Sequence, residues 1–194
     1  MQELSQKLQL PKHLFPLGKS SVLGRLIQQM QAVCSEILVI TSAAQEAVFQ
    51  EHLGKMGHPI PLRLQIKKDE GFAGDFKVMA AAYEAQLLVT MGDLVFAPHV
   101  LPTIAAHQGP NVIVIDRTTA PHFDFRIIGG KIQKNLITKL QQVNPESFWP
   151  MFKLVASEVL RGRGKVTFLP SLFNLNTPQA YQQAQAYFAQ HPEA

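Results

Sequence analysis

The chain has 194 residues, 46% of them hydrophobic, a size and composition typical of one domain that buries a core without disulfides or structural metals. Its 18 basic and 14 acidic residues are scattered, so the net charge of +4 favours anionic ligands weakly and argues against nucleic acid as a partner. The single cysteine, Cys34, excludes an internal disulfide, and no apolar run approaches the roughly 20 residues of a membrane helix. We therefore expect a single cytoplasmic domain over residues 1–194, with no membrane partner.

Between residues 20 and 116, helix-like and strand-like segments alternate along the chain. Ser20 or Ser21 can cap a first helix, and Thr41 or Ser42 can cap a second. Helical patterns mark 22–30, 43–56, 72–85 and 98–107, and short apolar or alternating runs that suit strands mark 37–40, 62–66, 87–91 and 112–115. Strands that alternate with helices of this length predict βαβ units and a right-handed, mostly parallel sheet.

Beyond residue 116 the alternation becomes less regular. The segments 123–128 and 131–133 flank Gly129-Gly130 and together predict a β-hairpin, because paired glycines favour tight turns. Further along the chain the patterns predict helices over 135–143 and 145–160, a strand over 165–169 and a last helix after Pro178.

The most informative short segment is Met91-Gly92-Asp93-Leu94, which follows the apolar run 87–91. Open parallel sheets bind ligands beyond the carboxyl ends of their strands, so we expect Asp93 at a ligand-binding edge. A carboxylate there can hold Mg²⁺ against the phosphates of a nucleotide, and Gly92 would let those phosphates approach the backbone. The alternative is that Asp93 only ends the strand or caps the next helix.

A second segment, Pro11-Lys12-His13-Leu14-Phe15-Pro16-Leu17-Gly18, precedes an amphipathic helix and a strand. It resembles a stretch of the sugar-1-phosphate nucleotidyltransferases, in which the lysine neutralises phosphate charge in the transition state. The resemblance gives this catalytic and nucleotide-binding role to Lys12. Without the resemblance, an exposed lysine after a proline would be expected to face solvent.

A third segment, Gly71-Phe72-Ala73-Gly74-Asp75, is similar to the glycine-threonine-alanine-glycine turn of the same family, which packs against the nucleotide and opens a helix. The resemblance implies nucleotide-binding roles for Gly71, Ala73 and Gly74, while Phe72 stands where the family has threonine. Glycines before a helix also serve as turns and caps, which is the structural alternative.

A fourth segment, Asn174-Leu175-Asn176-Thr177-Pro178, resembles the asparagine-threonine-proline ending of MobA-like transferases, where an asparagine or aspartate completes the metal site. The resemblance implies that Asn176 is a second metal ligand beside Asp93, with Asn174 behind it. Thr177 as an N-cap and Pro178 as the first helical residue explain half of this motif without a ligand.

The four segments occur in the order found in the nucleotidyltransferase superfamily and span residues 10–184. The resemblance implies an α/β fold, a three-layer α/β/α, mostly parallel, Rossmann-like sheet of the GT-A-like type. It also implies Mg²⁺-dependent transfer of NMP from an NTP to a sugar phosphate or similar phosphorylated acceptor, with release of pyrophosphate. Two alternatives stay open: molybdenum-cofactor nucleotidyl transfer, and a non-catalytic or truncated pseudoenzyme that keeps the fold for binding.

The family's first strand and its glycine-rich turn have no counterpart here, because residues 1–9 contain neither glycine nor a β-branched residue. We expect that strand to be central in the sheet, so its absence would leave neighbouring strands with unpaired edges. Three explanations are that the chain starts too late or is a fragment, that it is a degenerate binding module, or that another segment takes the strand's place.

Other candidate residues carry weaker signals. His99, His107 and His122 lack the spacing of a metal site. Trp149, between Phe148 and Phe152, indicates a core position or a contact between two copies of the chain, so a homo-oligomer stays open.

Overall fold

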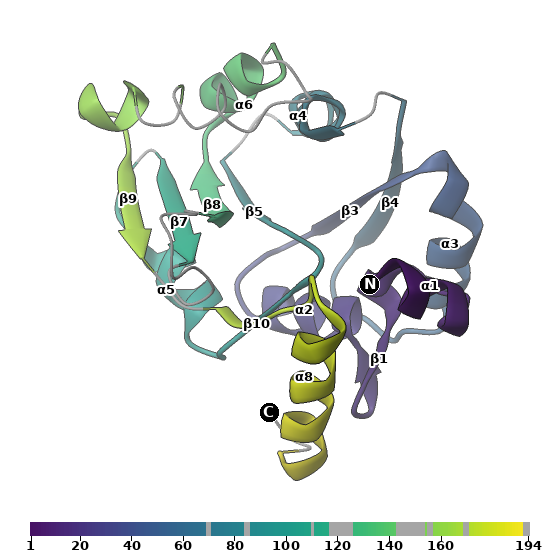
Figure 1. The fold of residues 1–194 in the computed structure, drawn as a ribbon. Coiled ribbons are helices and arrows are strands. Elements are labelled where there is room, and N and C mark those ends of the chain that lie inside the picture. Colours follow the sequence, from purple (N-terminus) through teal and green to yellow (C-terminus); the bar gives the residue numbers. More distant parts are fainter. Residues whose placement is uncertain are drawn as a thin grey trace.

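A computed structural model describes residues 1–68, 71–83, 86–109, 111–116, 126–142, 154, 157–168 and 171–191. Helices and strands alternate along the chain, which confirms the expected α/β class (Figure 1). The elements in chain order are α1 (Gln2–Leu8), the 3₁₀-helix η1 (Lys12–Leu14), β1 (Pro16–Leu17), β2 (Ser20–Ser21), α2 (Val22–Gln31), β3 (Ile37–Ser42), the 3₁₀-helix η2 (Ala43–Gln45), α3 (Glu46–Gly54), β4 (Leu62–Lys67), α4 (Gly71–Ala82), β5 (Leu87–Thr90), β6 (Leu94–Phe96), α5 (Val100–Ala106), β7 (Val112–Asp116), β8 (Arg126–Ile132), α6 (Lys134–Leu140), β9 (Lys165–Phe168), β10 (Ser171–Asn174) and α8 (Pro178–Gln190).

The longer strands form two groups. β3 and β4 are parallel neighbours, in register from Ile37 opposite Leu62 to Ser42 opposite Lys67, as expected for strands joined by a helical crossover. The second group has the order β5-β8-β7-β9, in which β7 and β9 are parallel and β8 is antiparallel to both of its neighbours. Among the described strands, β3 has a partner on one side only and so has β5.

The predicted hairpin around Gly129-Gly130 is wrong, because both glycines lie inside the continuous strand β8. Gly129 and Gly130 pair with β5 on one side and with β7 on the other. The register against β7 shifts next to Gly129, where Val114 lies opposite Gly129 and Ile115 opposite Ile127. Glycines in a strand often mark such a bulge, and the neighbouring strands hold this pair extended.

Helices cover the two groups of strands from both sides, with α2 and α4 on opposite sides of β3 and β5 (Figure 1). Helix α2 begins at the predicted cap, where the Ser21 hydroxyl accepts a hydrogen bond from the Gly24 amide at 2.9 Å. Its apolar residues Leu23 and Ile27 are buried against β3 and α3, while Leu26 packs near β6 and α5. The helical spacing of these residues therefore places one helix over two parts of the core.

The last helix, α8, joins the end of the chain to its beginning. Thr177 is its N-cap and Pro178 lies in its first turn, as the sequence predicts. Tyr181 and Phe188 pack with Phe15 in one buried cluster, and the Tyr181 hydroxyl donates to the Pro16 carbonyl oxygen at 2.7 Å. This packing holds the segment around residues 171–178 against the segment around residues 10–17.

Several predicted features fall partly or wholly outside the described residues. These include His122, Trp149, the segment 123–125 and most of the helix expected over 145–160, of which residue 154 and residues 157–160 are described and helical. Within the described ranges, no helix is long and apolar enough to cross a membrane.

Candidate functional site

Three of the residues singled out in the sequence meet at one point in the structure. The Lys12 ammonium group donates to Asp93 Oδ2 at 2.5 Å and to Asn176 Oδ1 at 2.6 Å. Lys12 is 81 residues from Asp93 and 164 residues from Asn176 in the chain. The three motifs therefore converge in space, although their catalytic and metal-binding roles stay predictions.

Strand pairing and local structure explain this convergence. Asp93 lies in the turn between β5 and β6, and β6 pairs antiparallel with β10 so that Leu94 lies opposite Asn174. The Leu175 amide also donates to the Asp93 carbonyl oxygen at 3.1 Å, which fixes the start of the segment that carries Asn176. Lys12 reaches the same point from the first residue of η1.

The cluster is partly shielded from water. The Asp93 side chain is 8% exposed and the Lys12 side chain 28% exposed. The Lys12–Asp93 pair thus lies in a partly desolvated place, where charge interactions are stronger than in bulk water, whereas Asn176 is exposed and contacts Lys12 from the solvent side.

Oxygen atoms of this kind are the ligands that Mg²⁺ and Mn²⁺ prefer. Among the described residues there is no group of three or more histidine, cysteine, aspartate or glutamate side chains that could hold a metal ion. Mg²⁺ is commonly held by one or two protein ligands together with substrate phosphates and water. Asp93 and Asn176 fit that pattern, with Lys12 now at the place where their oxygens converge.

His13 belongs to the same neighbourhood and was not singled out in the sequence. Its Nδ1 atom is buried and has no hydrogen-bond partner, and its ring contacts Phe49 with 6.1 Å between centroids. Burial lowers the pKa of the imidazole below its ordinary value, against the opposing effect of the Asp93 carboxylate. The signal available in the sequence was its position next to Lys12 in the motif.

Gly92 has a packing role beside this histidine. A Cβ atom at Gly92 would lie 3.2 Å from His13 Cδ2, which is tighter than an ordinary contact. The absence of a side chain at Gly92 therefore lets the imidazole lie against the turn that carries Asp93. Approach of a phosphate to the Gly92 backbone stays a prediction.

The predicted nucleotide-binding turn forms the start of α4. Gly71, Ala73 and Gly74 all lie in its first turn, and Gly71 has a positive φ of 67°, which favours glycine. Lys67 Nζ donates to the Gly71 carbonyl oxygen at 3.2 Å and pairs with Asp75 at 3.0 Å. Burial raises the pKa of the Asp75 carboxyl, and Lys67 opposes this shift.

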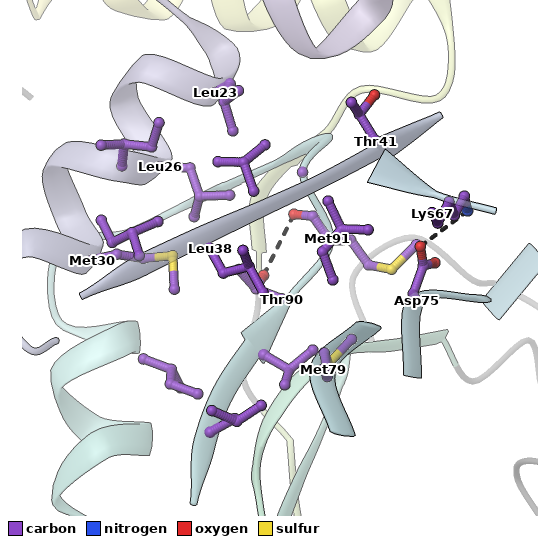
Figure 2. A pocket seen from close by; sticks show the side chains of 18 of the residues that line it. Leu23, Leu26, Met30, Leu38, Thr41, Lys67, Asp75, Met79, Thr90 and Met91 are labelled. Atoms are coloured by element: carbon purple, nitrogen blue, oxygen red, sulfur yellow. Dashed lines mark hydrogen bonds and ion pairs between the residues drawn. The ribbon is translucent and has the colours of Figure 1, made fainter. Parts of the chain in front are cut away.

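One cavity of about 1130 Å³ connects these two regions. His13 and Gly92 line this cavity near the cluster of Lys12, Asp93 and Asn176, called the Lys12 cluster below. Lys67, Gly71 and Asp75 line it near α4. Figure 2 shows Lys67 and Asp75 at one end of this cavity, near Thr41 and Met91. Lys67 is thus a second basic side chain near the candidate site that the sequence patterns did not mark.

The basic segment at residues 161–165 has a structural function. Arg161 and Arg163 both pair with the buried Glu158, at 3.3 Å and 3.0 Å, and Lys139 pairs with it at 2.8 Å. These cations lower the pKa of Glu158, with the hydrogen bond from Lys139 as the largest cause. The positive charge of this segment therefore neutralises a buried carboxylate.

Comparison with solved structures identifies the fold. A 4-diphosphocytidyl-2C-methyl-D-erythritol synthase from Anaerococcus prevotii superposes with a TM-score of 0.69 at 15% identity, covering 90% of this chain and 92% of the other. A Bacillus anthracis protein described as a glucose-1-phosphate thymidylyltransferase gives 0.67 at 14% identity, with coverages of 91% and 85%. Rv0371c of Mycobacterium tuberculosis, in complex with manganese, gives 0.60 at 17% identity, with coverages of 91% and 92%. The fold is thus that of the nucleotidyltransferases.

Sequence comparison identifies the family. None of the curated proteins matches this chain significantly. Residues 3–147, which include Lys12, Gly71, Gly74 and Asp93, match the family model described as the MobA-like NTP transferase domain. Because this match covers most of the chain, the protein belongs to the family of MobA-like NTP transferase domains.

Proposed function

We propose that this protein transfers a nucleotidyl group from an NTP to a phosphorylated small-molecule acceptor, with a divalent cation. The observation that carries the proposal is the meeting of Lys12, Asp93 and Asn176 beyond the end of β5. Family membership and the neighbours that act as nucleotidyltransferases support the reaction class. The manganese in one neighbour supports the choice of a divalent cation, for which Mg²⁺ is our candidate.

In the proposed reaction, a phosphate oxygen of the acceptor attacks the α-phosphorus of the NTP. A new phosphorus–oxygen bond forms, the bond between the α-phosphorus and its bridging oxygen to the β-phosphate breaks, and pyrophosphate leaves with that electron pair. Negative charge spreads over the phosphate oxygens as this happens, so fixed positive charge at that place lowers the barrier. Lys12 is positioned to provide it once its ammonium group turns from the Asp93 and Asn176 oxygens to a phosphate.

The remaining groups have binding roles in this proposal. Asp93 and Asn176 would hold the divalent cation, which when bound neutralises phosphate charge. The start of α4, with Gly71, Ala73 and Gly74, and the backbone at Gly92 would bind the nucleotide. A sugar phosphate is our first candidate acceptor, and the molybdenum cofactor is the second because of the family match.

A non-catalytic binding protein is the alternative from a different class. Two observations favour it: Lys12 already occupies the place between the Asp93 and Asn176 oxygens, and a large cavity separates β3 from β5. Under this alternative the chain keeps the fold of the family without turnover.

A pyrophosphate-release assay tests the proposal. The chain would be incubated with each common NTP, a panel of sugar phosphates, and either Mg²⁺ or Mn²⁺. We expect turnover with one nucleotide, and a loss of at least about 100-fold in kcat for Asp93→Asn and Lys12→Met. Lys55→Met is the matched control, because Lys55, which follows the last residue of α3, makes an exposed ion pair of similar length, 2.6 Å, with Glu51.

Two results would separate the alternatives. An NTP that raises the melting temperature without turnover in any mixture would support the binding protein. If Lys55→Met lowers kcat as much as Lys12→Met, the Lys12 cluster is not the catalytic centre.

A further inference from the structure

The cavity between β3 and β5, here called the slot, lies between two strands and two helices. It is bordered along its length by β3 on one side and by β5 on the other. α2 closes it with Leu26 and Met30, and α4 closes it from the opposite side with Met79 (Figure 2). The four elements therefore border a cavity of about 1130 Å³ whose lining is mostly apolar.

The backbone of the two bordering strands is arranged to accept a partner. Among the described strands, β3 forms a ladder only with β4, and β5 only with β8. All the residues of both strands line the slot, from which we infer that the second edge of each strand faces it. Unpaired edges of this kind are templates for strand addition, and buried backbone groups without partners are unfavourable.

The side chains of these strands are also incompletely covered. Leu38 and Ile40 are only half-buried, and so are all the residues of β5, although the apolar composition of both strands predicts burial. Strands with helices on both faces normally bury such residues completely. One more strand between β3 and β5 would cover them.

We propose that the slot binds an extended apolar polypeptide strand, which joins the two groups into one sheet of order β4-β3-strand-β5-β8-β7-β9. A strand of about six residues matches the length of β3, at about 3.3 Å per residue. Its side chains would face α2 on one side and α4 on the other, so both faces should be apolar, as for a strand rich in valine and isoleucine. Recognition would combine main-chain hydrogen bonds with burial of side chains.

The described parts of this chain do not supply that strand themselves. Residues 2–8 form α1, and Leu4 and Leu8 pack on the cluster around Phe15 instead. α8 packs on the same cluster. A second folded copy of this chain is not our candidate either, because the slot is bordered by a strand on each of two sides and by a helix on each of the other two.

A synthetic peptide tests the proposal without any measurement of activity. The probe has about six central valine and isoleucine residues, flanked by lysines for solubility. The control peptide has proline at alternate central positions, which removes main-chain donors and disfavours a central strand. Amide hydrogen exchange of the full chain would be followed with and without each peptide, together with thermal melting.

We expect the valine and isoleucine peptide to slow exchange in β3 and β5 and to raise the melting temperature by roughly 5 to 10 °C at saturation. The proline peptide should do neither. Leu38→Arg, which places a charge in the slot, should abolish the effect, whereas Leu160→Arg, at an 88% exposed position, should retain it.

Three results would overturn the proposal. One is no change in exchange or melting with the valine and isoleucine peptide. Another is equal protection by the proline peptide, which would indicate non-specific apolar binding. The third is full protection of both strands without any peptide. Protection at all protein concentrations would mean that the chain closes the slot itself, and protection only at high concentration would mean that a second copy closes it. If Leu38→Arg does not fold, the comparison of the two peptides on the unaltered chain decides the question.

Discussion

Removing the Lys12 ammonium group should destabilise the protein, because the largely buried Asp93 carboxylate then lacks that cation. In Lys12→Met, the Asp93 carboxylate loses a cation at 2.5 Å, and Asn176 Oδ1 loses one donor, at 2.6 Å. The Asp93 side chain is only 8% exposed, so water can replace the lost ammonium group only in part. Methionine preserves most of the length of the side chain, so the substitution mainly removes charge and hydrogen bonds.

The distance and the burial of the Lys12–Asp93 pair set the size of this effect. Two unit charges at the observed 2.5 Å attract by about 7 kcal/mol at an effective dielectric constant of about 20. Desolvation of the two groups offsets most of that attraction. A charged hydrogen bond of this type retains about 1.5 to 3 kcal/mol, and we expect that coupling energy between Lys12 and Asp93.

A double-mutant cycle measures this coupling energy from urea unfolding of Lys12→Met, Asp93→Asn and the double variant. The matched control is the cycle for Lys55 and Glu51, whose side chains are 71% and 69% exposed and lie 2.6 Å apart. Exposed pairs of this kind couple by about 0.3 to 0.5 kcal/mol. A Lys12–Asp93 coupling no larger than that of the exposed pair would contradict the predicted effect of burial.

Three further predictions follow from the contacts and titratable groups of the described residues. Thr177→Ala removes the oxygen that accepts from the Ala180 amide at 3.1 Å, so it should cost about 1 kcal/mol and lower the melting temperature by about 2 to 4 °C, whereas Thr177→Ser should not. Burial raises the pKa of the Cys34 thiol, so at neutral pH it should react with a thiol reagent more slowly than the unfolded chain does, and equal rates would contradict this. Burial lowers the pKa values of His13 and His52 below their ordinary value of 6.5, so the unfolded state binds protons first and the free energy of unfolding should fall as the pH drops through 6.5. Urea titrations at several pH values test this, and His52→Gln should flatten the dependence.

The local patterns of the sequence were sufficient for most of the regular elements. Helical spacing of apolar residues and a serine cap predict α2, and β-branched runs predict β3 and β7, because these signals depend on neighbours in the chain. Gly129-Gly130 shows where local signals are insufficient. Glycine permits a turn, but pairing with β5 and β7 on both sides keeps this pair in an extended strand.

The sequence alone also determined which residues are candidates for chemistry, since Lys12, Asp93 and Asn176 each belong to a short motif. Their meeting depends on tertiary contacts, because the pairing of β6 with β10 and the packing of α8 on Phe15 join segments that are distant in the chain. The same is true of His13, whose burial depends on the turn at Gly92. The sequence led us to expect unpaired edges beside a missing first strand, and among the described strands β3 and β5 each have such an edge. Neither strand by itself indicates this position, because a missing neighbour becomes apparent only when the ladders and the helices that cover them are assembled.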